Sequence, residues 1–209
     1  ALGVFMATLD TSIVNISLPT LVTYFQTDFA TIQWVVLAYG LVITSLMLSV
    51  ARLGDMLPKK RIYQTGLTLF VISSCLCGLA PSVGWLIAFR ALQGLGGTMM
   101  QALGMAMVTE IFPASERGRA LGTMGAVVSV GIAVGPPLGG LLIGLVGWQS
   151  VFWVNLPVGL ITAFFVWRFV PDLRSARPGQ RFDLAGAVIL MAVLITYASG
   201  MTRGQSIGF

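Results

Sequence analysis

Residues 9–19 read LDTSIVNISLP, which places the carboxylate of Asp10 inside a long apolar segment. Arg90 occupies a similar position in another apolar segment, while nearly every other charge falls in a short connecting stretch. A charged side chain near the centre of a membrane helix costs about 2.5 to 3.5 kcal/mol on insertion scales, whereas each Leu, Ile or Phe returns only about 0.3 to 0.6 kcal/mol. A sequence carries such a residue when it has a buried partner, lines a watery cavity or moves a proton. Asp10 and Arg90 are therefore the first candidates for function.

The composition identifies the class of protein. Hydrophobic residues make up 56% of the chain and charged residues 9%, which exceeds what a soluble core of this length could bury. Each apolar segment reaches the ~20 residues needed to cross ~30 Å of hydrocarbon as a helix, and the alternation typical of a membrane β-strand is absent. We therefore predict an all-α membrane protein with seven spans, at residues 1–23, 31–53, 62–80, 83–109, 119–145, 149–169 and 184–202.

The placement of the basic residues predicts the orientation. Most of the 12 Lys and Arg residues lie at the ends of spans 2, 4 and 6 or in the loops that follow: Arg52, Lys59, Lys60, Arg61, Arg117, Arg119, Arg168, Arg174, Arg177 and Arg181. By the positive-inside rule that side is cytoplasmic, so we expect a multi-pass protein of the cell membrane with a cytoplasmic amino terminus. The net charge of +5 is then a signal of topology, and we expect no nucleic acid among the partners.

Several missing motifs narrow the chemistry. The chain has no His, no phosphate-binding loop, no cluster of residues with metal-ligand spacing and no Gly-x-Ser-x-Gly elbow. We therefore expect a protein that is not an enzyme and that uses no cofactor or metal. The chain opens at Ala1 inside an apolar segment and ends at Phe209 just after the last span, so we expect a piece of a longer polytopic protein.

The loop after span 2 carries a compact charged motif. Residues 51–61 read ARLGDMLPKKR, a short hairpin with a helix-stopping Gly, an acid and three consecutive bases. One interpretation is a positive-inside anchor. The other is a cytoplasmic gate, in which Asp55 accepts hydrogen bonds in one conformation and releases them in another, with Lys59, Lys60 and Arg61 beside it.

Span 4 places polar and small residues on one face. At 3.6 residues per turn, one stripe contains Arg90, Gln93, Gly94, Gly97 and Gln101. Small residues on that stripe would admit the close approach of another helix. Arg90 could be tied to backbone carbonyls of a neighbour in a structural role, or it could face a cavity.

Span 5 contains a glycine repeat next to two prolines. Residues 131–140 read GIAVGPPLGG, in which Gly131, Gly135 and Gly139 recur every four residues and leave a groove for another helix. Pro136 and Pro137 remove hydrogen-bond donors and should bend the helix. Gly-Pro-x-x-Gly-Gly, which ends at Gly140, is more specific than a glycine repeat alone.

Together these motifs resemble the amino-terminal half of a major facilitator superfamily transporter, and within it the fourteen-helix drug:proton antiporters. The resembling stretches are residues 9–19, the loop around Asp55, residues 90–97, residues 131–140 and residues 148–159, which include Asn155-Leu156-Pro157. The chain departs from the usual family pattern at Ala51, Met56, Pro58 and Gln149.

The resemblance implies a domain organisation and a substrate site. Residues 1–169 would form a six-helix amino-terminal bundle, residues 170–183 a cytoplasmic linker, and residues 184–209 a seventh, linker transmembrane helix with a short outer segment. Substrate would bind between this bundle and a second one near mid-membrane. The expected cavity lining is Asp10, Asn15, Gln33, Trp34, Tyr39, Arg90, Gln93 and Gln101, although Trp34 and Tyr39 could instead be interface aromatics.

The function implied by the resemblance is proton-coupled efflux of small, amphipathic or cationic compounds. Deprotonated Asp10 would favour binding of a cation, and its protonation would favour release outside. Counting ~1.5 Å per residue, Asp10 and Arg90 differ in depth by only about 6 to 8 Å, so we expect them to couple, directly or through water. The expected partners are protons, a small-molecule substrate, the lipid bilayer and a missing carboxy-terminal half. The alternatives are a half-sized module that pairs with a second copy and transports nothing, and a lipid or metabolite exporter on the same scaffold.

Overall fold

The computed structural model describes residues 1–171 and 184–207, and this part of the chain is helical with no strand. Its helices are α1 (Leu2–Phe25), α2 (Phe29–Met56), α3 (Lys59–Gly78), α4 (Val83–Ile111), α5 (Ala114–Val146), α6 (Ser150–Trp153), α7 (Asn155–Phe169) and α8 (Leu184–Ile207). The all-α fold class is confirmed, and a helix covers each predicted span. Most of the predicted linker, from residue 172 to 183, lies outside the described residues.

Local sequence explains where the helices begin and end. Asp28 caps α2: the Thr31 hydroxyl donates to its carboxylate at 2.6 Å and the Thr31 backbone N–H at 2.9 Å. These two bonds lower the pKa of Asp28. Pro113 precedes α5, whose first turn carries Glu116, the sign of charge that a helix amino terminus favours. The sixth span is divided into α6 and α7 at Val154.

Four stretches of the described chain are long and apolar enough to cross a membrane: α1, α2, α5, and α6 with α7 together. The central helix α4 carries Arg90 and Gln93, and α3 begins with three basic residues and carries Ser73 and Ser74. Those polar side chains lower the hydropathy of α3 and α4. Arg90, Gln93, Ser73 and Ser74 are all buried inside the protein.

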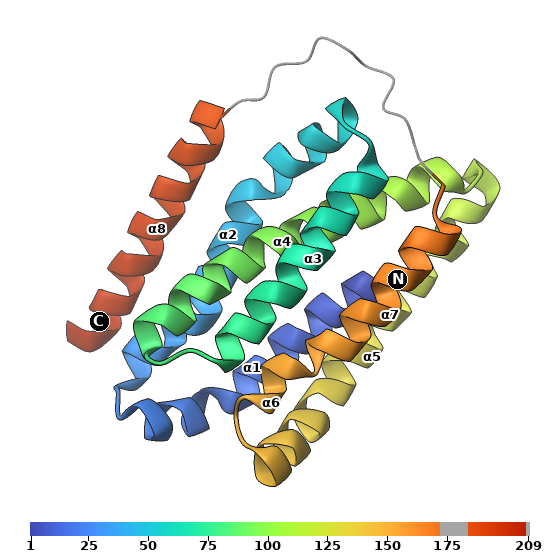
Figure 1. Ribbon diagram of the computed structural model, residues 1–209. Coiled ribbons are helices and arrows are strands. Elements are labelled where there is room, and N and C mark those ends of the chain that lie inside the picture. The colour runs from blue at the N-terminus through green and yellow to red at the C-terminus, as the bar shows by residue number, and fades with distance from the viewer. Residues whose placement is uncertain (172–183, 208–209) are drawn as a thin grey trace.

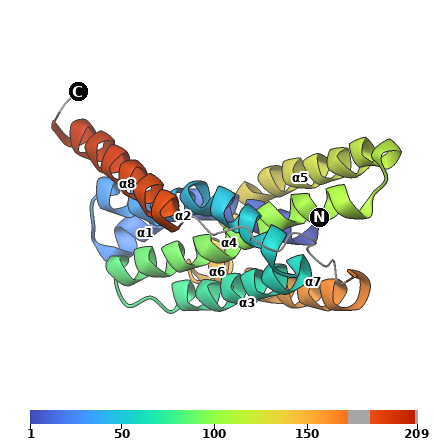
Figure 2. The ribbon, with the colours of Figure 1, turned by 90° about the horizontal axis from the view of Figure 1, so that it is seen from above.

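The helices lie side by side in one bundle (Figure 1). The central helix α4 packs between α2 and α3, α1 packs along α5, and α7 packs against α3 and α1. Seen from above, α5 and α8 lie toward opposite ends of the molecule, and α8 packs against α2 (Figure 2). Helix α1 therefore contacts α2, α4, α5, α6 and α7, and its buried face carries Asp10 into the middle of the bundle.

Glycines allow α4 to approach both of its neighbours. A Cβ atom at Gly96 would lie 2.6 Å from both the Gly66 carbonyl oxygen and the Phe70 backbone nitrogen of α3. On the other side, a Cβ at Gly94 would lie 2.9 Å from the Tyr39 carbonyl oxygen of α2. Backbone atoms cannot move aside as a flexible side chain does, so only glycine fits at these contacts.

The glycine groove of α5 is occupied by α1. Gly131 faces Thr8, Gly135 faces Ser12 and Gly139 faces Ile13, so all three glycines of the α5 repeat pack against α1. Gly140, which we included in the predicted packing motif, is open: a Cβ there would meet no atom within 4 Å. The repeat that packs is therefore Gly131, Gly135 and Gly139, because Gly140 points to another side of the helix.

Candidate functional site

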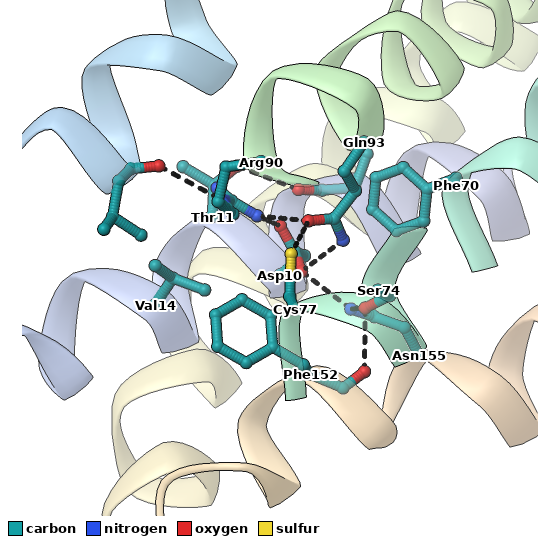
Figure 3. A network of polar contacts seen from close by, with 12 residues as sticks. Asp10, Thr11, Val14, Phe70, Ser74, Cys77, Arg90, Gln93, Phe152 and Asn155 are labelled. Carbon is teal, nitrogen blue, oxygen red and sulfur yellow. Dashed lines mark hydrogen bonds and ion pairs between the residues drawn. The ribbon is translucent and has the colours of Figure 1, made fainter. Parts of the chain in front are cut away.

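A buried ion pair joins α1 to α4 in the centre of the bundle. Arg90 Nη1 donates to Asp10 Oδ2 at 2.6 Å, and both side chains are 0% exposed (Figure 3). A buried pair of this kind is costly to form, since both ions lose their hydration, and it persists only when further hydrogen bonds satisfy the remaining polar atoms. The surrounding residues therefore decide what the pair can do.

Three donors converge on the Asp10 carboxylate from two helices. Besides Arg90, Gln93 Nε2 donates to Asp10 Oδ1 at 3.0 Å, and Asn155 Nδ2 donates to the same oxygen at 2.7 Å. The first two residues lie on α4 and Asn155 lies at the start of α7. Because all three groups donate, the arrangement fits an ionised carboxylate, which only accepts hydrogen bonds.

Arg90 is held by α2 as well as by α1. Its Nε donates to the Val35 carbonyl oxygen at 3.1 Å, and its guanidinium carbon lies 4.2 Å from the centre of the Tyr39 ring. Its Nη1 also donates to Gln93 Oε1 at 2.7 Å. Both interpretations of Arg90 from the sequence therefore describe real contacts, since it bonds a backbone carbonyl of another helix and it also bonds Asp10.

The network extends through Asn155 to α3 and α6. Asn155 Nδ2 donates to Ser74 Oγ at 2.9 Å, and Ser74 Oγ donates to the Phe152 carbonyl oxygen at 2.8 Å. Cys77 of α3 donates its thiol to Gln93 Oε1 at 3.8 Å. The cluster around Asp10 thus draws side chains or carbonyls from α1, α2, α3, α4, α6 and α7.

The Tyr39 hydroxyl is buried without a hydrogen-bond partner in the described residues, and so are two atoms of the side chains that bond Asp10, namely Arg90 Nη2 and Asn155 Oδ1. Buried polar atoms are nearly always paired in folded proteins, so an unpaired atom next to a charged group calls for an explanation. Arg90 Nη2 and Asn155 Oδ1 belong to side chains that contact Asp10. The cluster therefore has spare hydrogen-bonding capacity: one donor on Arg90, one acceptor on Asn155 and the hydroxyl of Tyr39.

The residues predicted to line the cavity divide into two sets. Tyr39 and Gln93 are buried and belong to the cluster around Asp10. Asn15 is exposed and Gln33, Trp34 and Gln101 are half-buried, and these four take no part in the hydrogen bonds around Asp10. Asn155, Ser74 and Cys77 were not predicted as site residues. Asn155 could have been found, because it is a polar side chain in an apolar span directly before Leu156-Pro157.

The loop motif forms a second polar group at the end of α2. The ammonium group of Lys59 contacts the carboxylate of Glu110 on α4 and lies 3.7 Å from Asp55 Oδ1. Lys60 donates to the Trp167 carbonyl oxygen of α7 at 3.2 Å, and Arg61 is exposed. The sequence left the partner of Asp55 open between a neighbouring helix end and a basic side chain, and it did not predict Glu110, because nothing in the motif specifies which other helix it meets.

Comparison with known proteins places the chain in a family. The family model described as Major Facilitator Superfamily matches residues 1–206. The chain belongs to the major facilitator superfamily. It is 40% identical to the riboflavin transporter RibZ of Clostridioides difficile over 90% of this chain and 41% of that protein. It is 38% identical to the multidrug resistance protein Stp of Mycobacterium tuberculosis, over 100% of this chain and 39% of the relative.

Other members of the superfamily agree with this assignment. The tetracenomycin C resistance and export protein of Streptomyces glaucescens is 32% identical over 100% of this chain and 39% of its own length. Among solved structures, an inward-facing bacterial homologue of the human lysosomal transporter Spinster matches with a TM-score of 0.67 and 19% identity, over 88% of this chain and 44% of that one. The chain spans about two fifths of the length of the relatives it matches.

Membership of the superfamily makes this an integral membrane protein, in agreement with the apolar helices described above. It also means that the Asp10–Arg90 pair lies in a low-dielectric medium, because the helices around it span a membrane. In such a medium, changing the protonation of one member alters the contacts of all the others.

Proposed function

We propose that this chain forms part of a proton-coupled exporter of small amphipathic or cationic compounds across the cell membrane. The observation that supports the proposal is the buried Asp10–Arg90 pair, which joins α1 to α4 and accepts further donors from α4 and α7. Ionisable residues inside membrane spans are costly, and they mark substrate or proton pathways in transporters. Among the described residues, Asp10 supplies the carboxylate of this cluster, so it is the group we assign to proton exchange.

The geometry suggests how proton uptake would change the protein. An ionised Asp10 makes full use of Arg90, Gln93 and Asn155 as donors. Protonation neutralises the carboxyl and turns one of its oxygens into a donor, so its attraction for Arg90 weakens. Because Arg90 belongs to α4 and is also tied to α2, loss of that contact alters how α1 packs on both helices. Alternating access needs such a difference in contacts between two states.

We propose that Asn15, Gln33, Trp34 and Gln101 contact the substrate. Their partial or full exposure leaves amide and aromatic groups free to contact a ligand, while Asp10 and Arg90 are buried in the core. A cationic ligand would be favoured while Asp10 is ionised. The second wall of the site would come from a carboxy-terminal bundle, since relatives extend well beyond the length matched here.

We propose that Lys59, Asp55 and Glu110, here called the Lys59 cluster, act as a gate on the cytoplasmic side. The amino terminus of the chain would lie on the same side. The Lys59 ammonium contacts Glu110 of α4 and lies near Asp55 of α2. It therefore joins α2 and α4 at their carboxy-terminal ends, and Arg90 joins the same two helices nearer their amino-terminal ends, where it donates to the Val35 carbonyl. A change in the contacts of one cluster would then alter the contacts of the other, because both include residues of the rigid helix α4.

A second candidate is the export or exchange of a planar, uncharged metabolite. The relative that is 40% identical is named as a riboflavin transporter, whereas three other relatives are named for drug resistance or efflux. The two candidates share the fold and differ in the charge of the ligand. A substrate panel can therefore separate them.

The test is transport by the purified full-length protein in sealed vesicles under an imposed proton gradient. We expect gradient-dependent movement of a cationic dye, and its loss in Asp10→Asn. Movement of riboflavin but not of the dye would favour the second candidate. Gradient-dependent dye transport that is undiminished in Asp10→Asn would overturn the role of Asp10, and no movement of any compound in the panel would overturn the proposed activity.

A further inference from the structure

We infer that Asn155 is the residue that senses the protonation of Asp10, by turning its amide so that it donates to the ionised carboxylate and accepts from the neutral one. This inference rests on the proposed proton coupling at Asp10. It comes from a specific asymmetry in the contacts of Asn155. The nitrogen Nδ2 has two partners, Asp10 Oδ1 at 2.7 Å and Ser74 Oγ at 2.9 Å, while Oδ1 is buried with none among the described residues.

A half-turn of the amide would bring the unpaired oxygen of Asn155 to the place where a protonated Asp10 needs an acceptor. When a proton from water binds to Asp10, the new O–H group becomes a donor and must find an acceptor in a buried site. Gln93 Oε1 already accepts from Arg90, at 2.7 Å. Asn155 already contacts Asp10 Oδ1, and a half-turn of its amide exchanges Nδ2 for the free Oδ1. The Asp10 O–H then donates to Asn155, and no other covalent bond changes.

The half-turn also carries a signal away from Asp10. In the ionised state, Asn155 Nδ2 links α7 to α3 through Ser74, and Ser74 in turn donates to the Phe152 carbonyl of α6. Turning the amide removes the donor that Ser74 Oγ accepts and presents an oxygen in its place. Ser74 must then either redirect its hydroxyl from Phe152 to Asn155 or lose the contact. Protonation of Asp10 on α1 thereby changes the hydrogen bonds of Ser74, which lies where α3, α6 and α7 meet.

Several titratable groups face Asp10, and none of them supplies this acceptor. They are Arg90 from α4, Tyr39 from α2 and Cys77 from α3. Arginine is a donor only, the Tyr39 hydroxyl faces Thr11 and makes no hydrogen bond to Asp10, and the thiol is a weak acceptor that already points to Gln93. The face of α5 that packs on α1 offers glycines, α6 offers the apolar side chain of Phe152, and α7 offers Asn155. Asn155 is therefore the neighbour that can both donate to Asp10 and accept from it.

The direct test is infrared difference spectroscopy on the full-length protein with carbonyl-labelled asparagine, recorded while the pH is changed across the protonation of Asp10. The Asn155 band is assigned by its absence in Asn155→Leu. We expect the Asn155 C=O band to move to lower wavenumber as the Asp10 carboxylic acid band appears, because Oδ1 gains a donor. An Asn155 band that stays in place while Asp10 protonates would overturn the inference.

Transport by variants provides the second measurement. Leucine has a similar size to asparagine but can neither donate nor accept, so Asn155→Leu should lower proton-driven transport about tenfold, the worth of about one hydrogen bond to a charged group. Asn155→Gln keeps both functions and should restore part of the rate. Thr162→Val is the matched control on α7, because the Thr162 hydroxyl is buried but bonds only the Val158 carbonyl of its own helix at 2.7 Å. Equal rates in Asn155→Leu and Thr162→Val would contradict the inference.

The two proposals fail in different ways. If the labelled asparagine band responds to Asp10 while transport is indifferent to Asp10→Asn, the switch stands and the proton-coupled function falls. If transport depends on Asp10 while the Asn155 band is silent, the function stands and the switch falls. Should Asn155→Leu not fold, Asn155→Gln assigns the band by removing the labelled carbonyl, so the spectroscopic test on the native protein remains decisive.

Discussion

The hydroxyl of Ser12 on α1 donates a hydrogen bond of 3.0 Å to the backbone carbonyl of Ile132 on α5. Ile132 lies four residues before Pro136, which has no N–H and so cannot donate to that carbonyl as a normal helical residue would. Gly135 makes the contact possible, because a Cβ atom there would overlap the Ser12 side chain. One residue of α1 therefore replaces the hydrogen bond that the proline of α5 removes.

This relationship predicts a coupled effect of two substitutions. Ser12→Ala leaves the Ile132 carbonyl without its donor and should destabilise the protein by about 0.6 kcal/mol, the average for hydrogen bonds between membrane helices, and by no more than about 1.7 kcal/mol. In a Pro136→Ala background, the introduced alanine can supply the helical N–H, so the same Ser12→Ala change should cost close to nothing. A double-mutant cycle of unfolding in detergent measures the difference. Equal costs in the two backgrounds would show that the hydroxyl does not serve the proline.

The glycine groove gives a prediction with an internal control. Gly135→Ala places a methyl group against Ser12 and should destabilise the protein by about 1 to 3 kcal/mol, and Gly135→Leu should do so more strongly. Gly140→Ala adds the same methyl group where nothing lies within 4 Å, so it should leave the melting temperature unchanged. Thermal unfolding of the purified variants compares them. A larger loss in Gly140→Ala than in Gly135→Ala would refute the packing described for α5.

The Asp10 site predicts different outcomes for two substitutions. Asp10→Asn keeps an oxygen that can accept from Arg90, so the protein should insert and fold, while proton-driven transport is lost. Asp10→Ala leaves Arg90 buried and unpaired, which should destabilise the fold by about 3 to 5 kcal/mol. Size-exclusion profiles and melting curves report folding, and vesicle assays report transport. The role assigned to Asp10 would be untenable if the two variants were equally stable and both transported normally.

The Lys59 cluster predicts rescue by exchange of charges. Lys59→Glu brings two like charges together beside Glu110, and repulsion at ~4 Å amounts to about 1 to 4 kcal/mol. We expect transport to fall at least fivefold in that variant. Lys59→Glu combined with Glu110→Lys restores opposite charges and should recover most of the rate. A double variant as impaired as the single one would argue for a simple topological anchor at this loop.

Local patterns in the chain were informative about faces of helices. Membrane depth singled out Asp10 and Arg90, and the glycine spacing of α5 indicated a groove. Depth also predicted that Asp10 and Arg90 couple with each other, whereas the glycine spacing named no partner: the groove of α5 is filled by Thr8, Ser12 and Ile13 of α1. A period describes which residues share one side of a helix, and any other apolar helix with small residues could satisfy it.

Apolar length and the position of charges by themselves determined that this is an all-α membrane protein, and where its helices lie. They also determined which two charged residues lie at membrane depth. The reason is that the cost of placing polar groups in hydrocarbon acts on each segment separately. Only the tertiary structure decided that Asn155, 145 residues after Asp10 in the chain, donates to its carboxylate, and that Glu110 meets Lys59. Those contacts depend on how six helices pack around one another, and the directional hydrogen bonds of a buried charge select among packings that apolar patterning leaves equivalent.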